Sequence, residues 1–183
     1  MPSRLDPGKS GDGVSAVKPA KAYLDLRKVV LRRTAADFGL HPTAALPNVW
    51  GALVEVGFDA GSASLMAAAD GSTSLYLSNG GATIGGGAVP EIADATQHLL
   101  TLVEGWLSSF APARSFPLPG RDQVRFVALT FDGARTAEAG LDELSAGGHP
   151  LTPVFRASEI VLAAMQRLQA ATDAANAANA AAC

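Results

Sequence analysis

Residues 62–87 read SASLMAAADGSTSLYLSNGGATIGGG, and this stretch decides the fold. Two short apolar runs, 63–69 and 72–78, flank the dipeptide Asp70-Gly71. Asp-Gly readily supplies the positive φ angles of a tight hairpin turn, so the two runs are predicted to be paired antiparallel strands. A glycine-rich loop, residues 80–87, follows, and an amphipathic segment, residues 89–107, is predicted to be a helix.

The flanking sequence extends this unit in both directions. Apolar residues recur at helical spacing over 18–38, and the β-branched and aromatic run VWGALVEVGF, 49–58, reads as a largely buried strand. Downstream, Asp132-Gly133 predicts a second hairpin with strands 124–131 and 134–139, and 153–171 is predicted to be a helix. The expected fold is therefore α+β, a five-stranded antiparallel sheet with three helices in the order α-β-β-β-α-β-β-α.

Composition suggests one compact domain. The chain has 183 residues, 48% of them hydrophobic, which is enough for a core without metal or disulfide staples. Residues 1–17 are rich in Gly, Pro and charge and are expected to be a flexible arm. Residues 18–171 are expected to form the domain, and residues 172–183 an Ala/Asn-rich tail that frays or extends the last helix.

Charge and cysteine content narrow the class of protein. The only cysteine is Cys183, so no internal disulfide can form, and no apolar segment resembles a signal peptide or a membrane span. We therefore expect a cytoplasmic protein. Residues 1–33 hold eight Lys and Arg against three Asp, a net charge of +5, whereas the remaining residues carry −8. An acidic body argues against nucleic-acid binding as the function.

The glycine-rich loop is the sharpest functional hint. It lies after a predicted strand and before a predicted helix, where backbone N–H groups can cradle an anion such as a nucleotide or phosphometabolite. The candidate residues are Gly81, Thr83, Gly85, Gly86 and Gly87. The loop has neither the lysine of a P-loop nor the dinucleotide glycine spacing, so the alternative is structural: a bulge, a tight exit from the sheet or close backbone packing.

Other chemistry finds little support in the sequence. The histidines His41, His98 and His149 lie far apart with no second ligand nearby, so no metal site or cofactor is expected. No nucleophile elbow is present, and we expect no enzymatic activity and no catalytic residues. Glu55 and Glu138 fall in predicted strands, where a lone carboxylate is expected to face water.

The predicted helix 89–107 is apolar on two sides. One stripe is formed by Ile92, Ala95, Leu99, Val103 and Trp106. A second ridge, Ala93, Leu100 and Leu107, lies on another side. A helix that is apolar on two sides is either sandwiched or placed at an interface, so these three residues are the candidate interaction residues.

The element order resembles the α+β fold of type III secretion chaperones and of YbjN-like proteins, with roadblock and profilin-like modules as the second choice. The segments DGSTSLYLSNGGATIGGG, TFDGARTAEA and HPLTPVF also resemble sequences of an uncharacterised family of bacterial cytoplasmic proteins. The chaperone-like resemblance implies a homodimer that binds another protein chain. The leading interpretation is thus a non-enzymatic adaptor or chaperone-like interaction module, and the alternative is a small anionic-ligand binding domain that uses the glycine-rich loop.

Overall fold

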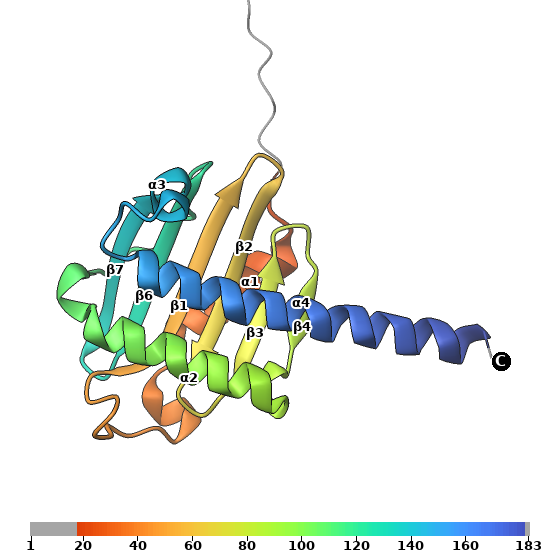
Figure 1. Ribbon diagram of the computed structural model, residues 1–183, viewed down its shortest axis with the longest axis horizontal. Coiled ribbons are helices and arrows are strands. Elements are labelled where there is room, and N and C mark those ends of the chain that lie inside the picture. Colours follow the sequence, from red (N-terminus) through yellow and green to blue (C-terminus); the bar gives the residue numbers. More distant parts are fainter. Residues whose placement is uncertain (1–17, 182–183) are drawn as a thin grey trace, which may run out of the picture.

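The structure is a computed structural model that describes residues 18–181 (Figure 1). The predicted arm, residues 1–17, and the last two residues of the predicted tail lie outside the described residues.

The described residues form one antiparallel sheet with helices on both faces. Its strands are β1 (Val49–Phe58), β2 (Gly61–Ala68), β3 (Thr73–Leu77), β4 (Ala82–Ile84), β5 (Ala111–Pro112), β6 (Gln123–Thr130) and β7 (Gly133–Gly140). The α-helices are α1 (Lys21–Arg32), α2 (Pro90–Gly105), α3 (Leu141–Ala146) and α4 (Thr152–Ala181). Three short 3₁₀ helices are η1 (Ala35–Phe38), η2 (Gly86–Ala88) and η3 (Leu107–Ser109).

The predicted α+β class with an antiparallel sheet is confirmed, but the predicted number of elements is wrong. The described residues contain seven strands and four α-helices, not five strands and three helices. The additional elements are β4, β5 and α3, which have three, two and six residues. Elements this short are below the length at which a hydrophobic period can be recognised in a sequence.

The strand order is β4-β3-β2-β1-β6-β7-β5, so the two predicted hairpins lie on either side of the central strand β1. Both Asp-Gly turns are present. Gly71 has φ +86° and Gly133 has φ +129°, conformations that favour glycine. In the first turn the Asp70 carboxylate accepts hydrogen bonds from the Ser72 backbone N–H and hydroxyl, both 2.9 Å.

Each face of the sheet has its own apolar cluster. Helices α2 and α4 cover one face, where Leu99, Leu100 and Val161 are fully buried, and α1 lies across the other (Figure 1). The cluster under α1 is smaller and includes Tyr23, Trp50, Met66 and Tyr76 among others. The sheet is therefore enclosed on both sides, which explains why nearly every residue of β1 is buried.

A β-bulge changes the expected alternation at the start of β1. The pairing with β6 shifts between Val49 and Gly51. As a result Val49 packs in the cluster under α2 and α4, whereas Trp50 lies in the cluster under α1 together with Leu53. A strict two-residue period would place Trp50 on the same face as Ala52, and the extra residue of the bulge reverses this.

The first and last predicted helices have different ends from those expected. The predicted helix 18–38 breaks at Arg33 and Thr34, both extended, and resumes as η1, where Thr34 and Asp37 form a capping box. The last helix, predicted to end at residue 171, continues to Ala181 through the predicted tail. Its alanines favour the helix, and its last turns are exposed and project past the sheet (Figure 1).

Candidate functional site

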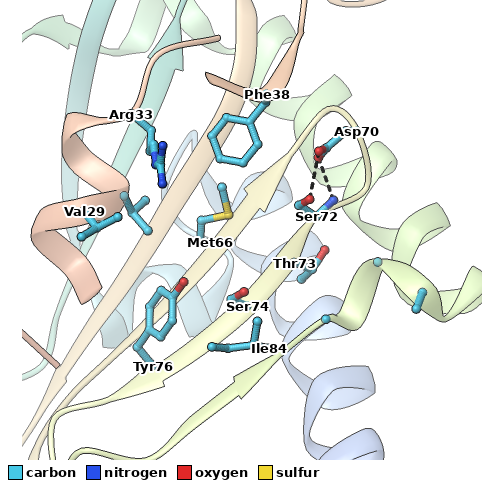
Figure 2. Close-up of a pocket in the computed structure, with 14 residues that line it drawn as sticks. Val29, Arg33, Phe38, Met66, Asp70, Ser72, Thr73, Ser74, Tyr76 and Ile84 are labelled. Atoms are coloured by element: carbon cyan, nitrogen blue, oxygen red, sulfur yellow. Dashed lines mark hydrogen bonds between the residues drawn. The ribbon is translucent and has the colours of Figure 1, made fainter. Parts of the chain in front are cut away.

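A groove of about 430 Å³ lies between α1 and strands β3 and β4 (Figure 2). We call it the α1–β3 groove. Its apolar side chains are Val29, Val30, Phe38, Met66, Ile84 and Ala88. Its polar residues are Arg33, Asp70, Ser72, Thr73, Ser74 and Tyr76, and Gly85 and Gly87 complete the lining.

The alternation of β3 places two hydroxyl side chains in this groove. Tyr76 belongs to the cluster under α1, whereas Leu75 belongs to the opposite cluster, so Ser74 and Tyr76 face the same side. Ile84 is the register partner of Ser74 and borders the groove from β4. Residues 74, 76 and 84 are thus brought together by the β3–β4 pairing.

Within residues 18–181 the hydroxyls of Ser74 and Tyr76 make no hydrogen bond to the protein, and both residues line the open groove; the one fully buried side-chain atom without a partner in this range is Thr152 Oγ1, elsewhere in the fold. Figure 2 shows the Tyr76 hydroxyl turned toward Met66 and Val29. Neighbouring Thr73 is different, because its hydroxyl bonds to the Gly71 carbonyl (2.9 Å) and to the Thr96 hydroxyl (2.7 Å). Hydroxyls at the surface of a groove bond to water or to a bound molecule, so these two are available to a ligand.

Arg33 supplies a cation to the same groove. It follows the last residue of α1, and its guanidinium extends toward Val29 and Met66 in Figure 2. The side chain is half exposed, and the carboxylate it faces, Asp37, is 3.8 Å away. Asp37 is itself held by Thr34, whose backbone N–H (2.8 Å) and hydroxyl (3.1 Å) lower the pKa of that carboxyl. Arg33 therefore keeps donors free for a bound group.

The glycine-rich loop is divided between two faces of the protein. Gly85, with φ +88°, and Gly87 line the α1–β3 groove. Thr83 faces away from it, because its hydroxyl donates to Gln169 of α4 (2.6 Å). Gly86 packs on Met165, and Gly81 lies in the β3–β4 turn, where its N–H donates to the Asn79 side chain (3.0 Å). The five candidate residues thus do not form one anion cradle.

Close packing accounts for two of these glycines. A Cβ at Gly87 would lie 2.4 Å from the Gly71 carbonyl oxygen, and one at Gly86 would lie 2.3 Å from the Met165 sulfur. The loop amides are also partly used, since Ala88 N–H donates to Gly85 O (3.1 Å) and Val89 N–H to Gly86 O (2.9 Å). The structural interpretation therefore explains Gly86 and Gly87, and Arg33 is the positive group that the loop itself lacks.

The three candidate interaction residues, Ala93 and Leu100 of α2 and Leu107 of η3, are mainly occupied by internal packing. Leu100 is fully buried in the core, and Leu107 is half-buried against it. Ala93 is also half-buried, near Gly71. The helix is apolar on two sides because it contacts both the sheet and α4. Leu100 therefore has no surface left for a partner.

A buried ion pair joins α1 to β1. Arg27 donates from Nε and Nη2 to the two carboxylate oxygens of Glu55, at 2.6 and 2.7 Å. Burial lowers the pKa of Arg27, but the hydrogen bond and charge of Glu55 outweigh this, and the pKa is raised overall. The expectation that Glu55 faces water is wrong, because its side chain is completely buried. Pairing with Arg27, 28 residues away, makes that burial tolerable.

The pair belongs to a larger polar network. Ser64 donates to Glu55 (2.7 Å), and the Tyr23 hydroxyl contacts Ser64 (2.8 Å) and Ser62 (3.1 Å). Arg125 contacts Glu138 and the Pro117 carbonyl, and burial lowers the pKa of its guanidinium. Glu138 is half exposed, as expected for a strand carboxylate that faces water, and it also forms an ion pair with Arg125. The network fixes α1 on the sheet and thereby positions one wall of the groove.

Residues 18–181 contain no cluster of metal-ligating side chains and no helix that could span a membrane. In this range no three His, Cys, Asp or Glu side chains gather as they would around a metal ion. His41 and His98 are exposed, and the His149 ring accepts a hydrogen bond from Leu151 N–H (3.1 Å). None of the helices in this range combines the length and apolar character needed to cross a bilayer.

Comparison of the chain with protein-family models, curated proteins and solved structures gave no match. The resemblance to chaperone-like folds therefore stays a prediction, and the function has to be inferred from the geometry of the site.

Proposed function

We propose that this protein is a non-enzymatic binding module that recognises an anionic group in the α1–β3 groove. One observation carries the proposal: the cation Arg33 and the hydroxyl-bearing side chains of Ser74 and Tyr76 line one groove, with apolar side chains between them. A concave, mainly apolar site with a few convergent polar groups is typical of small-ligand binding. The volume of about 430 Å³ suits a small molecule.

In this site the glycine-rich loop has a different role from the expected anion cradle. Gly85 and Gly87 lie at the groove and allow the backbone to pass close to it, whereas Arg33 of the α1 end provides the charge. Guanidinium groups bind carboxylates and phosphates through two parallel hydrogen bonds, which gives geometric specificity. The groove contains no paired acid and base poised on a nucleophile, which favours binding over catalysis.

Thermal-shift screening tests this function. A panel of nucleotides, phosphometabolites and organic acids is applied to the full chain and to the Arg33→Gln variant. A ligand at one hundred times its Kd should stabilise the wild type by about 2.7 kcal/mol. The expected result is at least one anion that raises the Tm of the wild type and not of the variant. Stabilisation by no anion in the panel would contradict the proposal.

A second candidate function, protein interaction as a homodimer or with another chain, is favoured by a different surface. An apolar cleft of about 170 Å³ lies between α4 and the ends of β1 and β2, and Phe58 on its rim is 47% exposed. Its lining includes Val56, Leu65, Phe155 and Leu162. Light scattering of the wild type and of Phe58→Asp tests this: a dimer that the substitution dissociates supports it, and a strict monomer at micromolar concentration opposes it.

A further inference from the structure

We infer that the ligand of the α1–β3 groove is a small amphipathic carboxylate, with one negative charge at one end of an apolar body. This inference rests on the proposed function and names its ligand class. Three properties of the groove lead to it: its charge, the order of its side chains and the state of the loop amides.

The charge of the groove suits a monoanion. Arg33 is the one cationic side chain in its lining, and the Asp70 carboxylate lies on the rim. Asp70 is already bonded to Ser72, so it acts as a fixed negative charge rather than as a ligand group. A second negative charge on the ligand would face Asp70 without a second cation to offset it. This disfavours phosphate monoesters and polyphosphates.

The loop amides offset the missing cations only in part, because some of them are already used. Phosphate sites in glycine-rich loops use several free backbone N–H groups at the start of a helix. Here the N–H groups of Ala88 and Val89 are bonded to loop carbonyls, and Pro90 has no N–H. Glu91 follows in the first turn of α2, where it pairs with Arg167. The start of α2 therefore carries its own negative side chain.

The order of side chains along the groove defines the rest of the ligand. Val29 and Met66 lie between Arg33 and Tyr76, and Ile84, which is 66% exposed, forms the facing rim (Figure 2). A carboxylate at Arg33 would thus be followed by an apolar segment between Val29 and Ile84. The hydroxyls of Ser74 and Tyr76 lie beyond and can bond to a polar group at the far end of the ligand.

Isothermal titration with matched probes tests the ligand class on the full chain. The carboxylates are benzoate, 2-naphthoate and decanoate. The controls are 2-naphthamide, which keeps the body and removes the charge, and inorganic phosphate and adenosine monophosphate, which carry phosphate charge. We expect at least one carboxylate to bind, and the amide and both phosphates to bind about tenfold more weakly or not at all.

Variants locate the binding. Arg33→Gln should weaken carboxylate binding by about tenfold or more, because a charge-assisted hydrogen bond is lost. The matched control is Arg32→Gln, which removes the same charge one residue earlier from a side chain outside the groove lining. Equal losses in the two variants would mean that only general electrostatics is at work and would overturn the inference. Circular dichroism checks that both variants fold.

The outcomes separate this inference from the function on which it rests. If phosphate or adenosine monophosphate binds through Arg33 and no carboxylate does, the carboxylate class is overturned while anion binding in the groove stands. If 2-naphthamide binds as well as 2-naphthoate, the charge is irrelevant and the inference fails. If no probe binds and the wider panel also fails, both are overturned.

Discussion

Arg27 of α1 and Glu55 of β1 form a two-point ion pair in the interior, with the Glu55 side chain fully buried and that of Arg27 10% exposed. The pair joins the helix to the central strand of the sheet. Because α1 forms one wall of the α1–β3 groove, the same contact that stabilises the fold also sets the geometry of the candidate site.

Removing one partner of this ion pair should lower the free energy of unfolding. Arg27→Met leaves the Glu55 carboxylate buried without its cation, and we expect the free energy of unfolding to fall by about 3–5 kcal/mol. Urea denaturation measures it. The control Lys21→Met removes an exposed pair with Asp25 and should cost less than about 1 kcal/mol. The double variant Arg27→Met/Glu55→Leu should recover most of the loss, because neither charge of the pair is then left buried without the other; a double variant as unstable as the single one would contradict this account.

The two buried tyrosines of the α1 face should respond differently to loss of their hydroxyls. Tyr23→Phe removes contacts to Ser62 and Ser64 and should reduce the free energy of unfolding by about 1 kcal/mol. Tyr76→Phe should leave stability nearly unchanged, because its hydroxyl lines the open groove and makes no hydrogen bond to the protein within residues 18–181. Denaturation of the two variants in parallel makes the comparison. A loss for Tyr76→Phe equal to that for Tyr23→Phe would show that its hydroxyl is used internally.

Gly87 should not tolerate a side chain. Alanine there would place its Cβ against the backbone of Gly71, which cannot move aside as a flexible side chain can, and a cost of about 1–3 kcal/mol is expected. Gly105, at the end of α2, has open space around its Cα, so Gly105→Ala should be neutral or stabilise by up to about 1 kcal/mol. Thermal denaturation distinguishes the two, and an equal effect at both sites would refute the packing argument.

The capping box of η1 should make a small contribution to acid sensitivity. The Thr34 backbone N–H, and then its hydroxyl, lower the pKa of the Asp37 carboxyl below its ordinary value of 3.8. A lowered folded-state pKa gives stability that is present above the ordinary value and is lost as the pH falls through the folded value. The window therefore lies at and below about pH 4.

NMR titration of Asp37 measures this shift directly. Thr34→Ala should raise the pKa of Asp37 only part of the way, because the backbone N–H, the larger cause, is still present. A pKa of Asp37 in the wild type at or above its ordinary value would show that the capping box does not form.

The parts of the fold that could be predicted depend on local signals. The bounds of β1 agree with the predicted strand because its β-branched and aromatic run is flanked by turn residues. The hairpins followed from two Asp-Gly dipeptides. The short strands β4 and β5 have no comparable signal, since each has only two or three residues and is defined by its pairing, β4 with β3 and β5 with β7.

The candidate site was predictable only in part, for a related reason. The sequence drew attention to the glycine-rich loop, and two of its residues, Gly85 and Gly87, do line the groove. Arg33 could not be assigned, because its position depends on the break after α1 and on the packing of α1 over β3. Glu55 was expected to face water, and only its partner on a different element explains its burial.

The lengths of the outermost strands have a consequence for the behaviour of the protein at high concentration. The sheet ends at β4, with three residues, and at β5, with two, one of which is Pro112 and has no N–H to donate. Long open edges are templates for uncontrolled strand pairing between molecules, and very short or proline-containing edges are poor ones. The β4 border and the proline of β5 are therefore poor templates for edge-to-edge pairing and fibril growth, and the part of β7 that extends beyond its two residues paired with β5 is the longer stretch of edge.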